Sequence, residues 1–355
     1  MRVRPGAASA HVGGLVGTDL QEVTDDVTAL DRGGRWAVAL PYDGPAVLAH
    51  FGRWEAGSAS DVEGPWCGPQ DWTTSLDRGE YVDAVDEVRS RIAAGDVYQA
   101  NICRVMASLM PDPKARDIGG LHALLSEGNP APFAGMLRLP DHDVHIACAS
   151  PELFLRRAHN VVESGPIKGT GRTPADLTAK DEAENVMIVD LVRNDLSRVC
   201  LPGTVTVPAL MSVEEHPGLV HLVSTVRGEL VPGAGWADII GAAFPPGSVT
   251  GAPKIAALQI IDGLETASRE FYCGAFGWVD ADQGTAELAV AIRTFWRRGD
   301  VLRFGTGAGI TWGSDAAAEW AETELKAARL VALAAGTTFP ATVAASAMLR
   351  PGGGT

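Results

Sequence analysis

Apolar positions recur along this chain with a helical period in four separate stretches. The clearest begins at Tyr81, after which apolar residues return at intervals of three and four up to Ile92, and Gly95 supplies a stop. This spacing predicts one helix with a single buried face. The same reasoning predicts further helices over residues 178–199, 253–262 and 314–334.

Short apolar runs bounded by turn residues predict strands between these helices. The predicted strands are Trp36–Leu40, Ala46–Ala49, Val97–Ala107, His145–Ala149, Leu153–Arg156, Leu219–Val226, Gly274–Val279, Ala286–Phe295 and Val301–Gly305. Strands and helices mix without regular βαβ alternation, which favours a large α+β domain with antiparallel sheets over a doubly wound fold. We expect residues 1–75 to form a short β-rich part of this domain, 76–340 its functional region, and 341–355 a mobile tail.

Composition narrows the classes of partner. The chain has 355 residues, 46% of them hydrophobic, and a formal net charge of −15. This acidity argues against binding to nucleic acid or an anionic membrane, because both need clustered cations. No apolar run approaches the roughly 20 residues that span a bilayer, and the N-terminus has no signal-peptide pattern. Five widely spaced cysteines fit reduced thiols, so we expect a cytoplasmic protein.

A lysine lies in the glycine-rich segment Ser164–Thr170. Gly165 and Gly169 permit backbone conformations that other residues avoid, and Pro166 fixes one dihedral angle. The turn could therefore present Lys168 and nearby backbone N–H groups to a carboxylate. The alternative is an ordinary solvated surface charge.

Two predicted helices carry carboxylates three residues apart. Asp181 and Glu184 form one pair, and Glu319 and Glu322 form the other. Two such faces could share Mg²⁺, which favours oxygen ligands and commonly bridges protein carboxylates to an anionic substrate. Each pair is also compatible with a solvated acidic helix face.

Four further positions are candidates for binding or catalysis. The segment Gly305–Ile310 follows a strand and could hold a carboxylate by its backbone N–H groups. Arg293 lies in an apolar run, where a guanidinium needs a substrate carboxylate or a structural Asp as partner. His221 is either a catalyst or a core residue. Glu152 precedes an apolar strand, where desolvation would raise its pKa and make it a general acid.

Taken together, these segments resemble the chorismate-utilising enzymes, the family of anthranilate synthase component I and aminodeoxychorismate synthase component I. The resemblance runs from about Gly95 to Leu330 through an ordered series of motifs. These are Asp96–Asn101, Ser150–Leu155, Pro166–Thr170, Ala183–Leu196, His221–Val226, Gly247–Lys254, Tyr272–Gly274, Ala291–Thr294 and Gly307–Gly309.

The resemblance implies a sandwich of two stacked antiparallel sheets with helices outside and a chorismate pocket between them. It implies that Glu184 and Glu322 hold Mg²⁺, with Glu319 within reach. The substrate-binding groups that it implies are Arg293 and Tyr272, the backbone of Gly307, Ala308 and Gly309, the pocket-lining Gly169 and Thr170, and His221 and Ser248 facing the ring and its side chain.

Two positions discriminate among the reactions of the family. Members that add water to chorismate resemble this chain but carry a lysine base where Gln99 stands, which makes ammonia the expected nucleophile here. Anthranilate synthases resemble it with alanine in place of Lys168. A lysine at this position is typical of aminodeoxychorismate synthases, which implies that Lys168 is the catalytic nucleophile and Glu152 the general acid.

The expected activity is therefore conversion of chorismate and ammonia to 4-amino-4-deoxychorismate, toward p-aminobenzoate for folate or another metabolite. The chain has no glutaminase motif, so it should use free ammonia or dock a glutamine amidotransferase subunit. Two enzyme alternatives stay open, an anthranilate synthase component I and a 2-amino-2-deoxychorismate synthase. A third alternative is a chorismate-binding subunit without catalytic activity.

Overall fold

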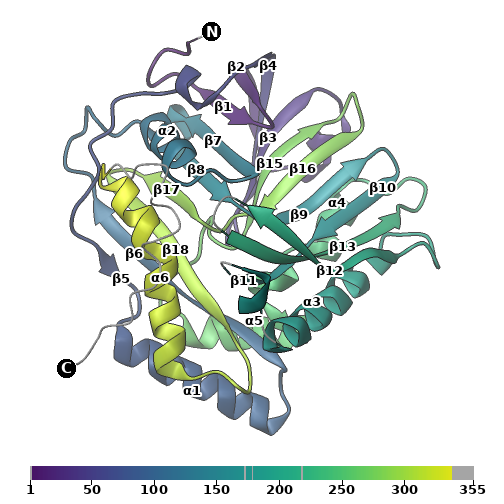
Figure 1. Cartoon of the computed structure of the whole chain (residues 1–355). Coiled ribbons are helices and arrows are strands. Elements are labelled where there is room, and N and C mark those ends of the chain that lie inside the picture. Colours follow the sequence, from purple (N-terminus) through teal and green to yellow (C-terminus); the bar gives the residue numbers. More distant parts are fainter. Residues whose placement is uncertain (1, 172, 178, 217–218, 338–355) are drawn as a thin grey trace.

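The structure, a computed structural model, describes residues 2–171, 173–177, 179–216 and 219–337 (Figure 1). The predicted tail over 341–355 lies outside the described residues. The helices are α1 (Arg78–Ala94), α2 (Ile118–Gly128), α3 (Ala179–Ser197), α4 (Trp236–Ala243), α5 (Lys254–Leu264) and α6 (Ala316–Ala334). Periodicity predicted α1, α3, α5 and α6, but it did not reveal α2 or α4.

The ends of α1 follow from local chemistry. Asp77 caps the first turn by accepting a hydrogen bond from the Glu80 backbone N–H, and the Glu80 carboxylate accepts one from the Asp77 backbone N–H in return. Gly95 ends the helix with a φ of 85°, a left-handed conformation that glycine adopts without strain.

The described residues form 18 strands. They are β1 (Ser9–Val12), β2 (Leu15–Thr24), β3 (Arg35–Leu40), β4 (Val47–Ala56), β5 (Thr73–Thr74), β6 (Gln99–Leu109), β7 (Phe133–Leu139), β8 (Val144–Ser150), β9 (Leu153–Ala158), β10 (Val161–Gly165), β11 (Ile167–Gly171), β12 (Thr206–His216), β13 (Leu219–Glu229), β14 (Gly251–Ala252), β15 (Ala275–Asp280), β16 (Thr285–Val290), β17 (Thr294–Arg298) and β18 (Val301–Ile310).

Every strand pairing among these residues is antiparallel, so the predicted α+β class is confirmed. One run of neighbours is β6, β18, β17, β8, β7 and β1. From β1 the pairing continues through β2, β4, β3, β15, β16, β9, β10, β13 and β12. The two runs form the two layers of the fold.

Side-chain alternation along the first run shows how the layers pack. Leu137, Ile146 and Trp296 belong to the large core cluster that also contains residues of β3, β15 and β16. The residues that precede Leu137 on β7 and Trp296 on β17, Met136 and Phe295, belong instead to a second cluster with apolar residues of α2 and α6. One face of this layer therefore meets the other layer, and the opposite face is covered by helices.

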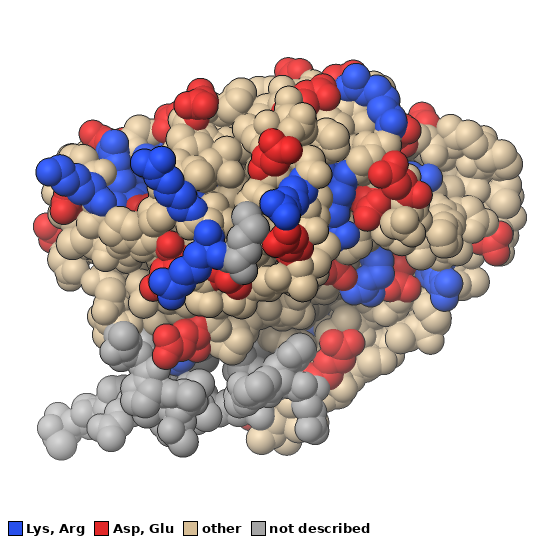
Figure 2. All heavy atoms as spheres, turned by 90° about the horizontal axis from the view of Figure 1, so that it is seen from above, with Lys and Arg blue, Asp and Glu red and all other residues tan. Residues whose placement is uncertain are grey.

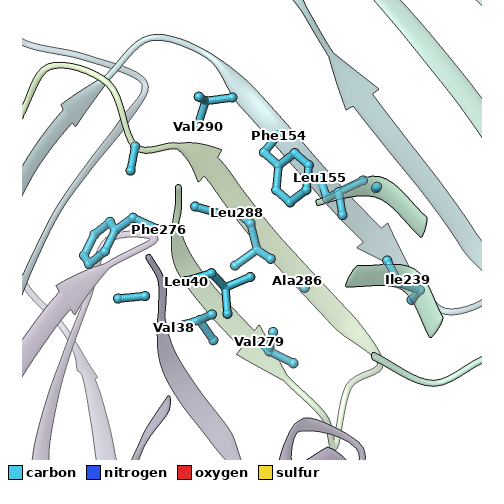
Figure 3. Packing of buried hydrophobic residues seen from close by; sticks show 14 of the residues in the cluster. Val38, Leu40, Phe154, Leu155, Ile239, Phe276, Val279, Ala286, Leu288 and Val290 are labelled. Carbon is cyan, nitrogen blue, oxygen red and sulfur yellow. The ribbon is translucent and has the colours of Figure 1, made fainter. Parts of the chain in front are cut away.

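The second layer contributes the other half of the large core. Figure 3 shows side chains of β3, β15, β16 and β9 meeting in it, and Ile239 of α4 belongs to the same cluster. Leu288 of β16 is completely buried at the centre of this group. Such burial of apolar surface is the main stabilising contribution to the fold.

The predicted strand over Ala286–Phe295 is wrong in one respect. The structure has two strands there, β16 and β17, separated by Ala291, Ile292 and Arg293. Arg293 has a φ of 52°, in the left-handed region, which is incompatible with a continuous strand. Arg293 therefore lies at a break between strands rather than within one.

Features of the surface agree with the composition. Acidic and basic side chains intermingle on the face seen in Figure 2, which has no continuous basic patch. Among the described helices, none is both long and apolar enough to cross a bilayer. All five cysteines are free thiols, as predicted.

Candidate functional site

Lys168 lies on β11, where the strand leaves regular register with β13 between Ile167 and Thr170. Gly169 produces this irregularity, since it has a φ of 83°. A Cβ at Gly169 would also lie 2.9 Å from the Cβ of Asp181, on α3. The Lys168 side chain is half-buried, and its Nζ donates a hydrogen bond of 3.4 Å to the carbonyl oxygen of Ser248.

Glu152 approaches the same serine from the turn between β8 and β9. This turn is held by the Ser150 hydroxyl, which accepts a hydrogen bond from the Glu152 backbone N–H and donates one to the Val290 carbonyl. The Glu152 side chain is 5% exposed. Burial raises the pKa of Glu152, and hydrogen bonds from Ser248 and the Ile167 backbone, with the charge of Lys168, only partly oppose this rise.

The side chain of Gln99 is directed toward the same region from β6. Gln99 is fully buried, and neither its Nε2 nor its Oε1 has a hydrogen-bond partner among the described residues. A Cβ added to Gly309 would lie 2.5 Å from the Gln99 Nε2 and 3.7 Å from the Lys168 Nζ. Glycine at 309 therefore leaves room where the amide and the lysine converge, and a polar ligand there would satisfy the buried amide.

The backbone of Gly307, Ala308 and Gly309 lies beside an opening in the sheet. These residues pair with β6 on one side, whereas β17 pairs only with the residues of β18 up to Phe304. The Gly307 carbonyl accepts a hydrogen bond of 3.0 Å from the Nζ of Lys326, on α6. The strand thus has peptide groups available to a ligand where β17 diverges.

Arg293 lies where β17 begins to diverge. Its backbone carbonyl accepts a hydrogen bond from the backbone N–H of Ala149 on β8. This bond holds the residues between β16 and β17 against β8. Desolvation lowers the pKa of its half-buried guanidinium. No hydrogen bond or ion pair of this guanidinium is found within the described ranges, so the structural Asp considered from the sequence is not found there.

Two other expected binding residues, His221 and Tyr272, have different surroundings. His221 is buried on β13, and its backbone pairs with Thr170 on β11. Tyr272 is buried with its ring against Gly305, where an added Cβ would lie 2.0 Å from the Tyr272 Cγ. The tyrosine ring therefore belongs to the packing beneath β18.

The expected metal ligands lie on two helices. Glu184 is half-buried on α3, and its neighbour Asn185 anchors this helix by accepting a 2.5 Å hydrogen bond from Ser224 of β13. On α6, Glu319 is buried and Glu322 forms a 2.6 Å ion pair with Lys326. Within the described parts of the chain, no three His, Cys, Asp or Glu side chains gather closely enough to hold a metal ion.

Sequence reasoning missed two groups of this region. Lys326 follows Glu322 by four residues on α6, a spacing that could have identified it as a partner of that carboxylate. Arg269 contacts the backbone of the turn that carries Ser248, and no local pattern signals such a long-range contact.

Comparisons with known proteins agree with the motifs. The family model for chorismate binding enzymes matches residues 61–332. The chain is 37% identical over 292 residues to aminodeoxychorismate synthase component 1 of Salmonella typhimurium, covering 79% of this chain and 63% of that protein. It is 40% identical over 268 residues to anthranilate synthase component 1 of Streptomyces coelicolor, covering 72% and 51%.

The chain thus spans less than two thirds of the length of both relatives. A crystal structure of anthranilate synthase component I from Streptococcus pneumoniae has the same fold, with a TM-score of 0.74 and 22% identity over 93% of this chain and 91% of that one. The family model covers most of the chain, and the motifs within it are the ones that surround Lys168, Glu152 and Ser248. The chain therefore belongs to the chorismate-binding enzyme family.

Proposed function

We propose that this chain is an aminodeoxychorismate synthase component I, which converts chorismate and ammonia to 4-amino-4-deoxychorismate. The proposal is supported by relatives that carry this name, among them those of Salmonella typhimurium and Klebsiella aerogenes. The observation that carries it is the meeting of Lys168 and Glu152 on Ser248. An amine and a carboxyl with a raised pKa that both contact one residue are candidates for a nucleophile and an acid at a common site.

The proposed reaction has two steps. In the first, the Lys168 amine bonds to C2 of chorismate while the C4 hydroxyl leaves as water with a proton from Glu152, and the two ring double bonds move from C1=C2 and C5=C6 to C1=C6 and C4=C5. In the second, ammonia bonds to C4, the bond between C2 and Lys168 breaks, and the proton lost by ammonia returns to the Glu152 carboxylate. The raised pKa of Glu152 favours the protonated form that the first step needs.

Binding of the substrate carboxylates falls to groups around the opening beside β18. The Arg293 guanidinium, for which the described residues supply no carboxylate, suits one of them. The backbone of Gly307, Ala308 and Gly309 suits a second contact. The buried Gln99 amide has a donor and an acceptor without partners among the described residues, and either group suits a hydrogen bond to substrate or ammonia.

Glu184 and Glu322, with Glu319 nearby, are the residues that would hold Mg²⁺. Their carboxylate oxygens fit the donor preference of this ion, which commonly completes its shell with water and substrate oxygens. When bound, Mg²⁺ would neutralise a substrate carboxylate and withdraw electron density from the ring. Lys326 would then exchange its contact with Glu322 for other acceptors.

A glutamine amidotransferase subunit is the proposed source of ammonia. The relatives named component 1 imply a second component of the enzyme. We place the reaction in the cytoplasm, which the five free thiols support.

The second candidate is an anthranilate synthase component I, favoured by relatives such as the one of Streptomyces coelicolor. Lys168 argues against this candidate, because the resemblance implies that anthranilate synthases carry alanine at this position. A catalytically idle chorismate-binding subunit is a weaker candidate, because Lys168, Glu152 and the acidic side chains are present together.

The test is product analysis with purified chain, chorismate, Mg²⁺ and ammonium, with and without aminodeoxychorismate lyase. We expect p-aminobenzoate only when the lyase is present. Fluorescent anthranilate formed without lyase would establish the second candidate instead. Binding of chorismate without turnover, under conditions that support a known synthase, would establish the idle subunit.

A further inference from the structure

A buried ion pair lies behind the turn that carries Ser248. Arg269 is 1% exposed and Glu265, which follows α5, is 6% exposed. The pair is bidentate, with 2.8 Å between Arg269 Nε and Glu265 Oε2 and 2.6 Å between Nη2 and Oε1. Glu265 Oε1 also accepts a hydrogen bond from the Cys103 backbone on β6. This geometry fixes the guanidinium plane in one orientation.

The other N–H groups of Arg269 bind two separate backbone segments. Nη1 donates a 2.9 Å hydrogen bond to the Val249 carbonyl, and Nη2 donates one of 2.7 Å to the Asn101 carbonyl on β6. The Asn101 N–H in turn donates to the Thr250 carbonyl at 2.7 Å. These hydrogen bonds hold the 3-10 turn over Gly247–Val249 against β6 at two points. Arg269 links Val249, the last residue of the turn, to Asn101, and Asn101 binds Thr250, the next residue, directly.

Ser248, the middle residue of this turn, is the residue on which the two proposed reactive side chains meet. Its carbonyl accepts from Lys168 at 3.4 Å, and its side chain acts on Glu152, opposing the rise in the pKa of that carboxyl. A displacement of the turn would therefore change the position of both side chains at once. Misplacement of a reacting group by about 1 Å can lower a rate by roughly 100-fold.

We propose that Arg269, oriented by Glu265, is a positioning residue that sets Ser248 and thereby the relative placement of Lys168 and Glu152. The proposal rests on the proposed function, because it assigns both side chains to the reaction. Arg269 acts through the turn and not on the substrate. A purely structural pair would lower stability when broken but would leave the kinetics of the folded enzyme unchanged.

The chain offers a matched control for this distinction. Arg138 of β7 is also 1% exposed and pairs with Asp117, which is 7% exposed. Its other hydrogen bonds go to backbone carbonyls of Ala7 and Val62 and to Ser9, none of them in the site. Arg138→Lys therefore disturbs an equally buried guanidinium without touching the Ser248 turn.

The experiment compares Arg269→Lys with Arg138→Lys in the 4-amination assay, in unfolding, and in amide hydrogen exchange of the peptide that spans 247–250. For Arg269→Lys we expect kcat to fall roughly 10- to 100-fold with little change in KM. We also expect faster exchange of the turn, whereas Arg138→Lys should change only the unfolding midpoint. Ser248→Ala combined with Arg269→Lys should be far from additive, since both act through one residue.

Equal kcat values and equal exchange at 247–250 in the two lysine variants would overturn the positioning role. Should Arg269→Lys not fold, Glu265→Gln, which keeps the shape of its partner, takes its place with the same expected changes. A wild-type chain that forms no 4-amino product overturns the proposed function instead. The exchange measurement then still decides whether Arg269 holds the turn.

Discussion

Glu152 is the residue whose environment bears most directly on the pH dependence of the reaction. Its pKa is raised above the ordinary value of 4.5, because burial disfavours the carboxylate more than Ser248, Lys168, the Ile167 N–H and Lys326 favour it. The acid is the protonated form, so loss of this proton should produce a descending limb in kcat as the pH rises through the raised pKa.

The variant Glu152→Gln keeps the shape of the side chain but has no proton to give. We expect kcat to fall by about 10²–10⁴-fold and this descending limb to disappear from the plot of kcat against pH. A variant that keeps the wild-type limb would assign the limb to another group and remove Glu152 from the reaction.

Substitution of Arg293, another single residue of the site, tests how the substrate is bound. Because no described carboxylate pairs with its guanidinium, the proposed partner is a carboxylate of chorismate. A hydrogen bond to a charged group contributes about 1.5–3 kcal/mol, so Arg293→Ala should raise KM roughly 10- to 150-fold. The natural control is Arg193→Ala, which removes an exposed pair on α3 and should leave KM unchanged. Equal KM values in both variants would exclude the proposed contact.

Among the elements, β18 requires a residue without a side chain at position 305. Alanine at Gly305 would place its Cβ 2.0 Å from the Tyr272 Cγ, so strand or ring must shift. We expect Gly305→Ala to lower the free energy of unfolding by about 1–3 kcal/mol. Gly263 on α5 has no atom within 4 Å of an added Cβ, and Gly263→Ala should raise that free energy by up to about 1 kcal/mol.

Urea unfolding of the two glycine variants measures this contrast. The comparison separates steric overlap from the general effect of replacing glycine. Equal midpoints for the two variants would contradict the close packing of Tyr272 beneath β18.

Elements with a regular apolar period were predictable, and those without one were not. The face of α1 follows a period of three and four and ends at a glycine, which identified this helix. In α2, Ile118 through His122 are all buried, so polar and apolar positions do not alternate around the helix. The break at Arg293 was invisible for another reason, since a positive φ in a non-glycine residue is imposed by tertiary contacts.

The site was predictable only as far as its motifs reach. Local composition indicated Lys168 and Glu152 as reactive groups, and the resemblance supplied their roles. Contacts between segments distant in sequence bring the two residues together at Ser248. The same kind of contact directs the buried amide of Gln99 to this place, and neither could be predicted from the sequence. Lys326 could have been predicted from the sequence, because it follows Glu322 by four residues on one helix.

At the scale of the whole molecule, the proposal separates amination from the supply of ammonia. The isolated chain should convert chorismate with ammonium but not with glutamine, because the proposal assigns glutamine hydrolysis to a separate amidotransferase subunit. Adding a glutamine amidotransferase subunit should make glutamine effective. Turnover with glutamine by the isolated chain would show that ammonia is generated on this chain itself.

The most direct test of the account is the product formed by variants of Lys168. Lys168→Ala removes the nucleophile, and Lys168→Arg keeps the positive charge while removing nucleophilic reactivity. With chorismate, Mg²⁺ and ammonium, followed by mass-detected chromatography, the account predicts that both variants lose 4-amino-4-deoxychorismate formation by roughly 100-fold or more. Formation of this product at the wild-type rate by either variant would contradict a covalent role for Lys168.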